Sequence, residues 1–379
     1  MSAGEAAALR PWQVITGGLC GLVLTLGLAR FAYTPLLPSL QAHTGLGDAA
    51  AGALAAVNYA GYMSGALLAA WIDSPVWRQR LYGWGLWLAV LGTAAFGLGA
   101  WLPGWVLLRF LGGLCGAAGM LLGSGLVLGW LMRAGRRPEL GLYFVGIGLG
   151  IVVSALAGWG FTRAFPGQWQ PPWWLLGGVG LVFLVPAWRW RPPVPPAPAA
   201  LADDGSGPSR RWLWTMGAAY FAAGWGFVIN ATFTVAFVER EPALAGQGPL
   251  AWALVGLAAM PAVALWDRVA RRLGEKRALL LAFGLQAVAV AAPALSPSLT
   301  AALLGALGYG ATFIGIVSLT LALAGRRAPR NPGKAMARLT LSYGAAQVLA
   351  PALAGAMAQA SGRSEEHTSE LQSRLHLVC

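Results

Sequence analysis

Residues 13–38 read QVITGGLCGLVLTLGLARFAYTPLLP, and Arg30 is the only charged residue among them. A helix needs about 20 mostly apolar residues to cross the hydrocarbon core of a bilayer. The stretch therefore predicts a membrane-spanning helix. An ionisable side chain at that depth is costly and normally faces a bundle interior or a water-filled cavity, so Arg30 is also a candidate functional residue.

The composition of the whole chain is that of a membrane protein. Hydrophobic residues make up 57% and charged residues 10% of the 379 residues, whereas a soluble domain has about 25% charged residues. The formal net charge of +13 does not indicate nucleic-acid binding, because the basic residues fall in short clusters between apolar runs rather than on one face. No cysteine spacing predicts a metal site, and no cofactor is expected.

Further apolar runs follow the first one, so we predict an all-α polytopic membrane protein with about eleven spans. The predicted spans are residues 13–38, 49–72, 81–102, 104–132, 141–164, 173–189, 212–238, 249–266, 278–295, 298–324 and 335–358.

The loops between these runs alternate in charge. Loops on one side carry arginine clusters, whereas those on the other side hold only Arg163 and Arg240. By the positive-inside rule, the N-terminus and the arginine-rich loops are predicted to be cytoplasmic, which favours a bacterial inner membrane.

The chain divides into two related parts. Residues 191–211, RPPVPPAPAALADDGSGPSRR, form a Pro-rich and then Gly/Ser-rich linker between a six-helix bundle (1–190) and a second bundle (212–360). Asp73 follows the second run and Asp267 the eighth, 267 − 73 = 194 residues apart. Parallel six-helix repeats joined by a linker are a known transporter architecture.

These features resemble the major facilitator superfamily (MFS). Residues 27–38, GLARFAYTPLLP, resemble the first helix of the YbfB/YjiJ-type transporters, and Arg109 with Gly113 fits the R-x-x-x-G pattern of the fourth helix. The resemblance implies two six-helix bundles around a central cavity that the first and fourth helices line.

The superfamily's cytoplasmic gating motif, G-x-x-x-D-R-x-G-R-R, is kept unevenly. In the second copy, Val263 and Ala270 stand at the two glycine positions. In the first copy, Ala69 stands at the first glycine position and Ser74 at the first arginine position. The charged residues that the resemblance assigns to gating are Asp73, Arg78, Asp267, Arg268, Arg271 and Arg272.

The end of the chain departs from this pattern. From Arg363 it reads RSEEHTSELQSRL, which resembles the translation of a sequencing adapter. We therefore expect residues 361–379 to be a non-native tail joined to a truncated gene, with the twelfth helix missing. The alternative is a genuine polar tail.

Arg30 and Arg109 are the leading candidates for substrate binding. They lie about 10 Å and about 8 Å from the outer ends of their helices, from the rise of 1.5 Å per residue, so they share a depth. A pair of planar donors suits a carboxylate or phosphate. The alternatives are snorkelling of Arg109 to the outer interface and a structural interhelical pair for Arg30.

Polar side chains on other spans are expected to orient the substrate, although interhelical hydrogen bonding explains each equally well. They include Tyr33, Asn58, Tyr62, Asn230, Tyr343 and Gln347. The run Gly146–Gly150 (GIGLG) has no preceding strand, so we interpret it as a helix-packing surface rather than a nucleotide loop.

The sequence thus predicts a monomeric secondary transporter in the lipid bilayer that moves a small solute, with an anion favoured, by alternating access. A transporter-derived sensor is one alternative. A polytopic enzyme acting on lipid-linked substrates is the other, but it needs a cluster of catalytic groups, and the acidic residues lie almost entirely in loops.

Overall fold

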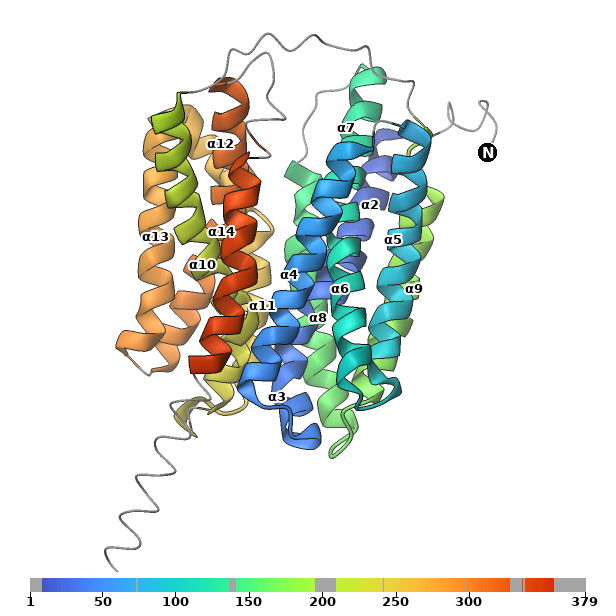
Figure 1. Cartoon of the computed structure of the whole chain (residues 1–379), viewed down its shortest axis with the longest axis vertical. Helices are drawn as coiled ribbons and strands as arrows, with labels where there is room; N and C mark the ends of the chain where they lie inside the picture. Colours follow the sequence, from blue (N-terminus) through green and yellow to red (C-terminus); the bar gives the residue numbers. More distant parts are fainter. Residues whose placement is uncertain are drawn as a thin grey trace, which may run out of the picture.

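The computed structural model describes residues 9–72, 74–135, 141–194, 209–240, 242–296, 298–327, 336 and 338–357. All regular secondary structure in these ranges is helical. Long helices run side by side in two groups, one from each half of the sequence (Figure 1). The predicted all-α polytopic fold is confirmed.

The first group comes from the first half of the sequence. Its helices are α2 (Pro11–Leu22), η1 (Val23–Phe31), α3 (Tyr33–Thr44), α4 (Asp48–Trp71), α5 (Pro75–Ala95), η2 (Phe96–Leu98), α6 (Leu102–Ala117), η3 (Ala118–Gly123), α7 (Ser124–Arg133), α8 (Gly141–Ala164) and α9 (Pro171–Arg189). Two spans are composite, because α2, η1 and α3 are continuous over Pro11–Thr44, and α6, η3 and α7 over Leu102–Arg133. In both, a π-helical segment, η1 or η3, joins two α-helices.

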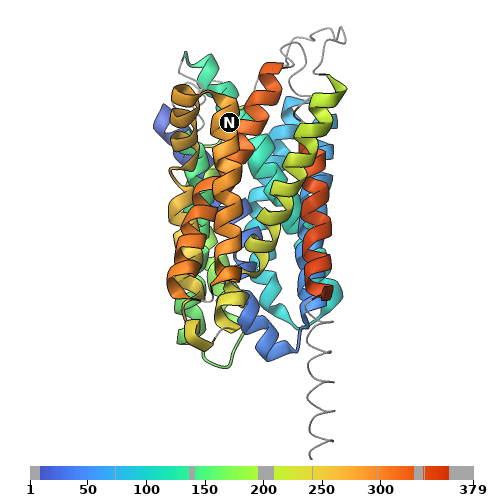
Figure 2. The same cartoon turned by 90° about the vertical axis from the view of Figure 1, so that its left-hand side faces the viewer.

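The second group comes from the second half of the sequence. It contains α10 (Arg210–Arg240), η4 (Pro242–Leu244), α11 (Gly248–Ala259), α12 (Ala262–Leu273), α13 (Glu275–Leu295), α14 (Leu299–Arg327) and a helix over residues 338–357. This last helix packs on α10, where Ser342 Oγ donates a hydrogen bond of 2.7 Å to the Gly217 carbonyl (Figure 2). Most of the predicted linker and all of the predicted tail lie outside the described residues.

Nine helices in the described ranges are long and apolar enough to cross a membrane, and the pair α11 and α12, bent by 47°, brings the number to ten if it is one span. The helix over 338–357 falls at the eleventh predicted run but is not among these ten, so the predicted count of eleven stays a prediction. The first span is longer than predicted. It continues past Pro38 to Thr44, where Gly45 ends it at a φ of 68° and its N–H bonds the Gln41 carbonyl.

The two groups are held together by close backbone contacts between small residues. Between the groups, a Cβ on Gly148 of α8 would lie 2.5 Å from the Gly256 carbonyl oxygen of α11. Within the first group, a Cβ on Gly150 of α8 would lie 2.6 Å from the Gly27 Cα of η1. Neither approach is possible with a larger residue. The prediction that the GIGLG run is a packing surface is confirmed.

The two halves also touch at the end of the bundle that is remote from the arginine-rich loops. There Thr34 Oγ1 of α3 donates a hydrogen bond to the Ala231 carbonyl of α10. Gly52 of α4 lies directly against the carbonyl of Pro351 on the last helix. This end of the molecule is therefore closed by contacts between the halves.

Within the first half, α4 and α6 approach so closely that Gly113→Ala should destabilise the protein. The new Cβ would overlap the Asn58 carbonyl oxygen and lie 2.6 Å from the Tyr62 nitrogen, and overpacking of this kind costs about 1–3 kcal/mol. Gly92→Ala in α5 is the control, since nothing lies within 4 Å of its Cβ position. Thermal denaturation of the purified proteins in detergent should show a lower midpoint for Gly113→Ala alone.

Candidate functional site

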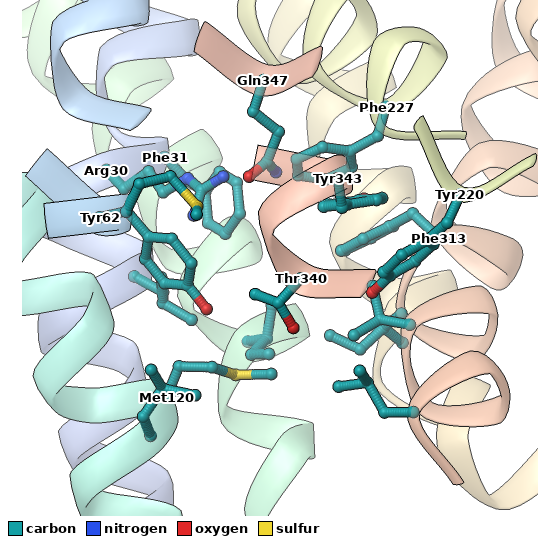
Figure 3. Close-up of a pocket in the computed structure, with 17 residues that line it drawn as sticks. Arg30, Phe31, Tyr62, Met120, Tyr220, Phe227, Phe313, Thr340, Tyr343 and Gln347 are labelled. Atoms are coloured by element: carbon teal, nitrogen blue, oxygen red, sulfur yellow. The ribbon is translucent and has the colours of Figure 1, made fainter. Parts of the chain in front are cut away.

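A central cavity of about 90 Å³ lies between the two halves (Figure 3). The first half lines it with residues of η1, α4, η3 and α8, and the second half with residues of α10, α14 and the last helix. Both π-helical segments therefore face the cavity. Such segments are rare and occur frequently at functional sites.

Among the described residues, Arg30 is the only charged one that lines this cavity. Its side chain is 6% exposed, and its Nε and Nη2 atoms have no hydrogen-bond partner among the described residues. A buried donor without a partner is costly, and more so when it carries charge. Unused guanidinium donors at a cavity wall are the main observation that points to a ligand.

Aromatic rings surround the Arg30 guanidinium. Its Cζ lies 4.2 Å from the ring centroid of Tyr59, 5.2 Å from that of Tyr62, 5.4 Å from that of Phe31 and 5.7 Å from that of Phe227. Cation–π attraction stabilises the charge but leaves the N–H groups unused. Because Phe227 belongs to α10 and the other rings to the first half, Arg30 lies at the boundary between the halves.

Arg109 lies in a different environment. Its Nε donates to the Leu54 carbonyl at 3.2 Å and its Nη1 to the Arg30 carbonyl at 3.4 Å. Its Cζ lies 4.3 Å from the Tyr33 ring centroid. The side chain is 5% exposed and does not line the central cavity. Arg109 therefore does not snorkel to the interface, and in this conformation it does not share a cavity with the Arg30 guanidinium. Its hydrogen bonds instead join α6 to α4 and η1.

The physical reason for this placement is the small residues beside Arg109. A Cβ on Gly112 would lie 2.8 Å from the Ala29 carbonyl oxygen, so α6 and η1 are close enough for the guanidinium to reach carbonyl groups of both neighbouring helices. Asn58 supports the same junction, because its Nδ2 donates to the Arg109 carbonyl at 2.8 Å.

The predicted substrate-binding residues separate into two sets. Arg30, Tyr62, Tyr343 and Gln347 line the central cavity. The others lie elsewhere in the described chain: Arg109 and Asn58 at the junction just described, Tyr33 with its hydroxyl donating to the Ala51 carbonyl at 3.0 Å, and Asn230 at a separate cavity of about 230 Å³ between α10, α13 and α14.

Several cavity residues were not predicted. They are mainly aromatic and thioether side chains: Phe31, Met63, Met120, Tyr220, Phe227 and Phe313, with Thr340 as a further polar one. Helical spacing was the available signal, because Tyr220 and Phe227 are seven residues apart, and Thr340 precedes Tyr343 by three and Gln347 by seven. The same spacing is also typical of ordinary packing.

A second cavity of about 390 Å³ continues from the first toward the arginine-rich end. The two share Met63, Leu121, Leu321 and Thr340. Arg78 also lines the second cavity, and its Nε donates to the Ile72 carbonyl at 2.7 Å. Space thus extends from Arg30 toward this end, whereas the opposite end is closed by contacts between the halves.

The other predicted gating residues lie at the same end. Asp267, Arg268, Arg271 and Arg272 are exposed on α12, and no ion pair joins them to another residue in the described part of the chain. Arg326 at the end of α14 pairs instead with Glu275 at the start of α13. Asp73 lies outside the described residues.

Comparison with known proteins identifies the fold and the family. The profile of the family described as "Uncharacterised MFS-type transporter YbfB" matches residues 22–378. The chain belongs to this family of MFS transporters. The match includes residues 361–378, within the segment that the sequence analysis expects to be non-native. No curated protein sequence matches the chain.

Solved transporter structures share the fold of this MFS chain. The inward-facing, unoccupied structure of a bacterial homologue of the lysosomal transporter Spinster is 18% identical, with a TM-score of 0.67 over 96% of this chain and 86% of that one. The nucleoside transporter NupG is 11% identical, with a TM-score of 0.64 over 92% and 91%. The D-xylose–proton symporter is 17% identical, with a TM-score of 0.65 over 89% and 88%. The predicted resemblance to the superfamily is confirmed.

The two buried arginines should differ in their effect on stability. Arg109→Lys keeps the charge but loses the fork that reaches two carbonyls, so it should lower the free energy of unfolding by about 2 kcal/mol. Arg30→Lys breaks no hydrogen bond and keeps a cation beside the rings, so the denaturation midpoint should change little. Thermal denaturation of both variants in detergent compares them directly, and equal losses would contradict the distinction.

Proposed function

We propose that this MFS transporter is a secondary active transporter of a small anionic solute, and that Arg30 binds the anion in the central cavity. The observation that carries the proposal is the buried Arg30 guanidinium, whose Nε and Nη2 have no partner among the described residues. Substrate sites of such transporters lie near the bilayer midplane, between the repeats.

The charge of the site supports an anion over a cation or a neutral solute. Arg30 brings one positive charge to the cavity wall, and the remaining lining residues are apolar, aromatic or uncharged polar groups. An anion would pair with the guanidinium in a region that excludes water, where charge-assisted hydrogen bonds are strong. A cation would meet like charge at low dielectric, which is costly.

The arrangement of the two halves supports alternating access. Cavities extend from Arg30 toward the arginine-rich end, and contacts such as Thr34 with Ala231 close the other end. We propose that the arginine-rich end is cytoplasmic, as the positive-inside rule predicts, and that this conformation is inward-facing. Rocking of the halves about their glycine contacts would open the opposite end. In this proposal the protein works as a monomer in a bacterial inner membrane, and a solute gradient drives transport.

Arg30→Lys should reduce transport of small carboxylates by at least about tenfold, the equivalent of losing one charge-assisted hydrogen bond. The assay is counterflow into proteoliposomes loaded with unlabelled acetate, lactate or benzoate, followed by entry of the same labelled anion. Arg163→Lys is the matched control, because Arg163 is exposed at the far end of α8, with its Cζ 4.5 Å from the Trp159 ring centroid.

Full counterflow by Arg30→Ala would contradict the assignment of Arg30. Binding of these anions without any counterflow would instead favour the sensor function.

Asp267→Asn should shift the protein further toward the conformation open at the arginine-rich end. The charges of α12 have no ion-pair partner among the described residues in that conformation, and we propose that they form their contacts when this end closes. Ala66 lines the second cavity, and labelling of Ala66→Cys by an impermeant maleimide reports its opening. The labelling rate should rise in the Asp267→Asn background, whereas an unchanged rate would count against a gating role.

A further inference from the structure

We propose that the central cavity selects monoanions in which a carboxylate is attached to a small flat apolar ring, with benzoate as the simplest example. This inference rests on the proposed function and narrows its substrate class. It follows from the different chemistry of the two sides of the cavity. One side is the guanidinium of Arg30, and the other is a wall of neighbouring aromatic rings in the second half.

The polar side is a guanidinium edge of defined shape. The free atoms, Nε and Nη2, can present two parallel N–H groups from one edge of the fork. That edge matches the two oxygens of a carboxylate lying in its plane. Four ring centroids lie within 5.7 Å of Cζ, and cation–π attraction to these rings supplies no acceptor for the two N–H groups.

The number of available charges favours a monoanion. In the described part of the chain, Arg30 is the only cation that lines the cavity. The other buried arginine, Arg109, donates from Nε and Nη1 to the carbonyls of Leu54 and Arg30. A phosphate monoester would bring up to two negative charges to a site that balances one, and the second charge would be buried without a partner.

The apolar side is a wall of rings from the second half. The ring centroids of Tyr220 and Tyr343 lie 4.4 Å apart, those of Phe227 and Phe313 lie 5.3 Å apart, and those of Phe227 and Tyr343 lie 5.9 Å apart. Figure 3 shows Tyr343, Tyr220 and Phe313 across the cavity from Arg30 and Tyr62. Aromatic groups prefer offset or edge-on contact with other rings, so a flat ring is the group that this wall fits.

Other residues that line the cavity also favour a ligand ring placed against the aromatic wall. Met63 and Met120 lie on the cavity wall, and thioethers make favourable contacts with ring edges while adapting to irregular shapes. Gln347 of the last helix also faces the cavity (Figure 3). Its amide can donate to a carboxylate oxygen or accept from a ring substituent.

The size of the central cavity limits the group held between Arg30 and the ring wall. A water molecule occupies about 10–15 Å³ of such space, so the 90 Å³ of the central cavity holds roughly six to nine water-sized groups. One ring with a carboxylate is of this size, whereas a nucleotide or a disaccharide would extend into the second cavity. A ligand that spans the cavity would touch η1 through its carboxylate and the second half through its ring, and would thereby connect the two halves.

The test measures binding of four probes to the purified full chain in detergent. The probes separate the contribution of the ligand's charge from that of its ring. The probes are benzoate, acetate with the same charge and no ring, benzyl alcohol with the ring and no charge, and benzylammonium with the ring and the opposite charge. The ligand-induced rise in denaturation midpoint, titrated to saturation, gives the apparent Kd. Benzoate should bind at least about tenfold more tightly than each of the other three probes.

Two substitutions assign the two sides of the cavity. Arg30→Lys should weaken benzoate by at least about tenfold, and Tyr343→Leu should weaken benzoate but leave the affinity for acetate unchanged, because only the ring contact is lost. Arg163→Lys should match the wild type for all four probes. Size-exclusion profiles and ligand-free midpoints identify any variant that fails to fold, and Arg30→Gln serves as the second substitution at Arg30.

The outcomes separate this inference from the proposed function. Equal affinity for acetate and benzoate, tighter binding of benzyl alcohol or benzylammonium, or benzoate binding that survives both Arg30 substitutions would overturn the substrate class. Counterflow of acetate without preference for benzoate would support anion transport and contradict the ring preference. Tight benzoate binding without counterflow would support the binding site and contradict the transport function.

Discussion

A guanidinium at the depth of the bilayer core needs a substitute for water, and the first half of this protein is packed around two of them. Lipid tails offer neither a donor nor an acceptor, so each charge must be stabilised by the protein or by a ligand. Arg109 is stabilised by carbonyl groups of neighbouring helices. Arg30, on the neighbouring η1, has aromatic rings around it but no acceptor for Nε and Nη2 among the described residues. This difference separates an arginine that joins helices from one that we propose binds the ligand.

Small residues make the arrangement possible. The carbonyls of Leu54 and Arg30 lie near Arg109 only because Gly112 and Gly113 let α6 approach η1 and α4 at backbone distance. In membranes such close approach is a main source of helix association, since burial of apolar surface gives no driving force between helices already in lipid. The same glycines that hold the helices together therefore also determine where the charge of Arg109 goes.

The halves contribute chemically different surfaces to the cavity between them. The first half supplies the charge on a π-helical segment, and the second supplies aromatic rings in contact with one another and the Gln347 amide. A ligand that needs both surfaces can interact differently with the two conformations of the protein, and only such a difference in affinity can shift a conformational equilibrium. Asp267 and the neighbouring arginines of α12 would bias the same equilibrium from the end of the bundle.

The sequence by itself determined the helical class, the positions of most spans and the division into halves, because apolar length and loop charge are local properties. It also singled out Arg30 as an isolated charge in an apolar run, and the binding role of Arg30 stays a prediction. It also predicted the packing role of Gly146–Gly150. It could not separate the roles of Arg30 and Arg109, which look alike in two apolar runs. Only the tertiary structure decided them, because the partner of a guanidinium depends on how closely three helices cross. The ring wall of Tyr220, Phe227 and Phe313 was likewise decided by tertiary structure. Helical spacing predicts that rings share one face of a helix, but it does not predict which neighbouring helix that face contacts.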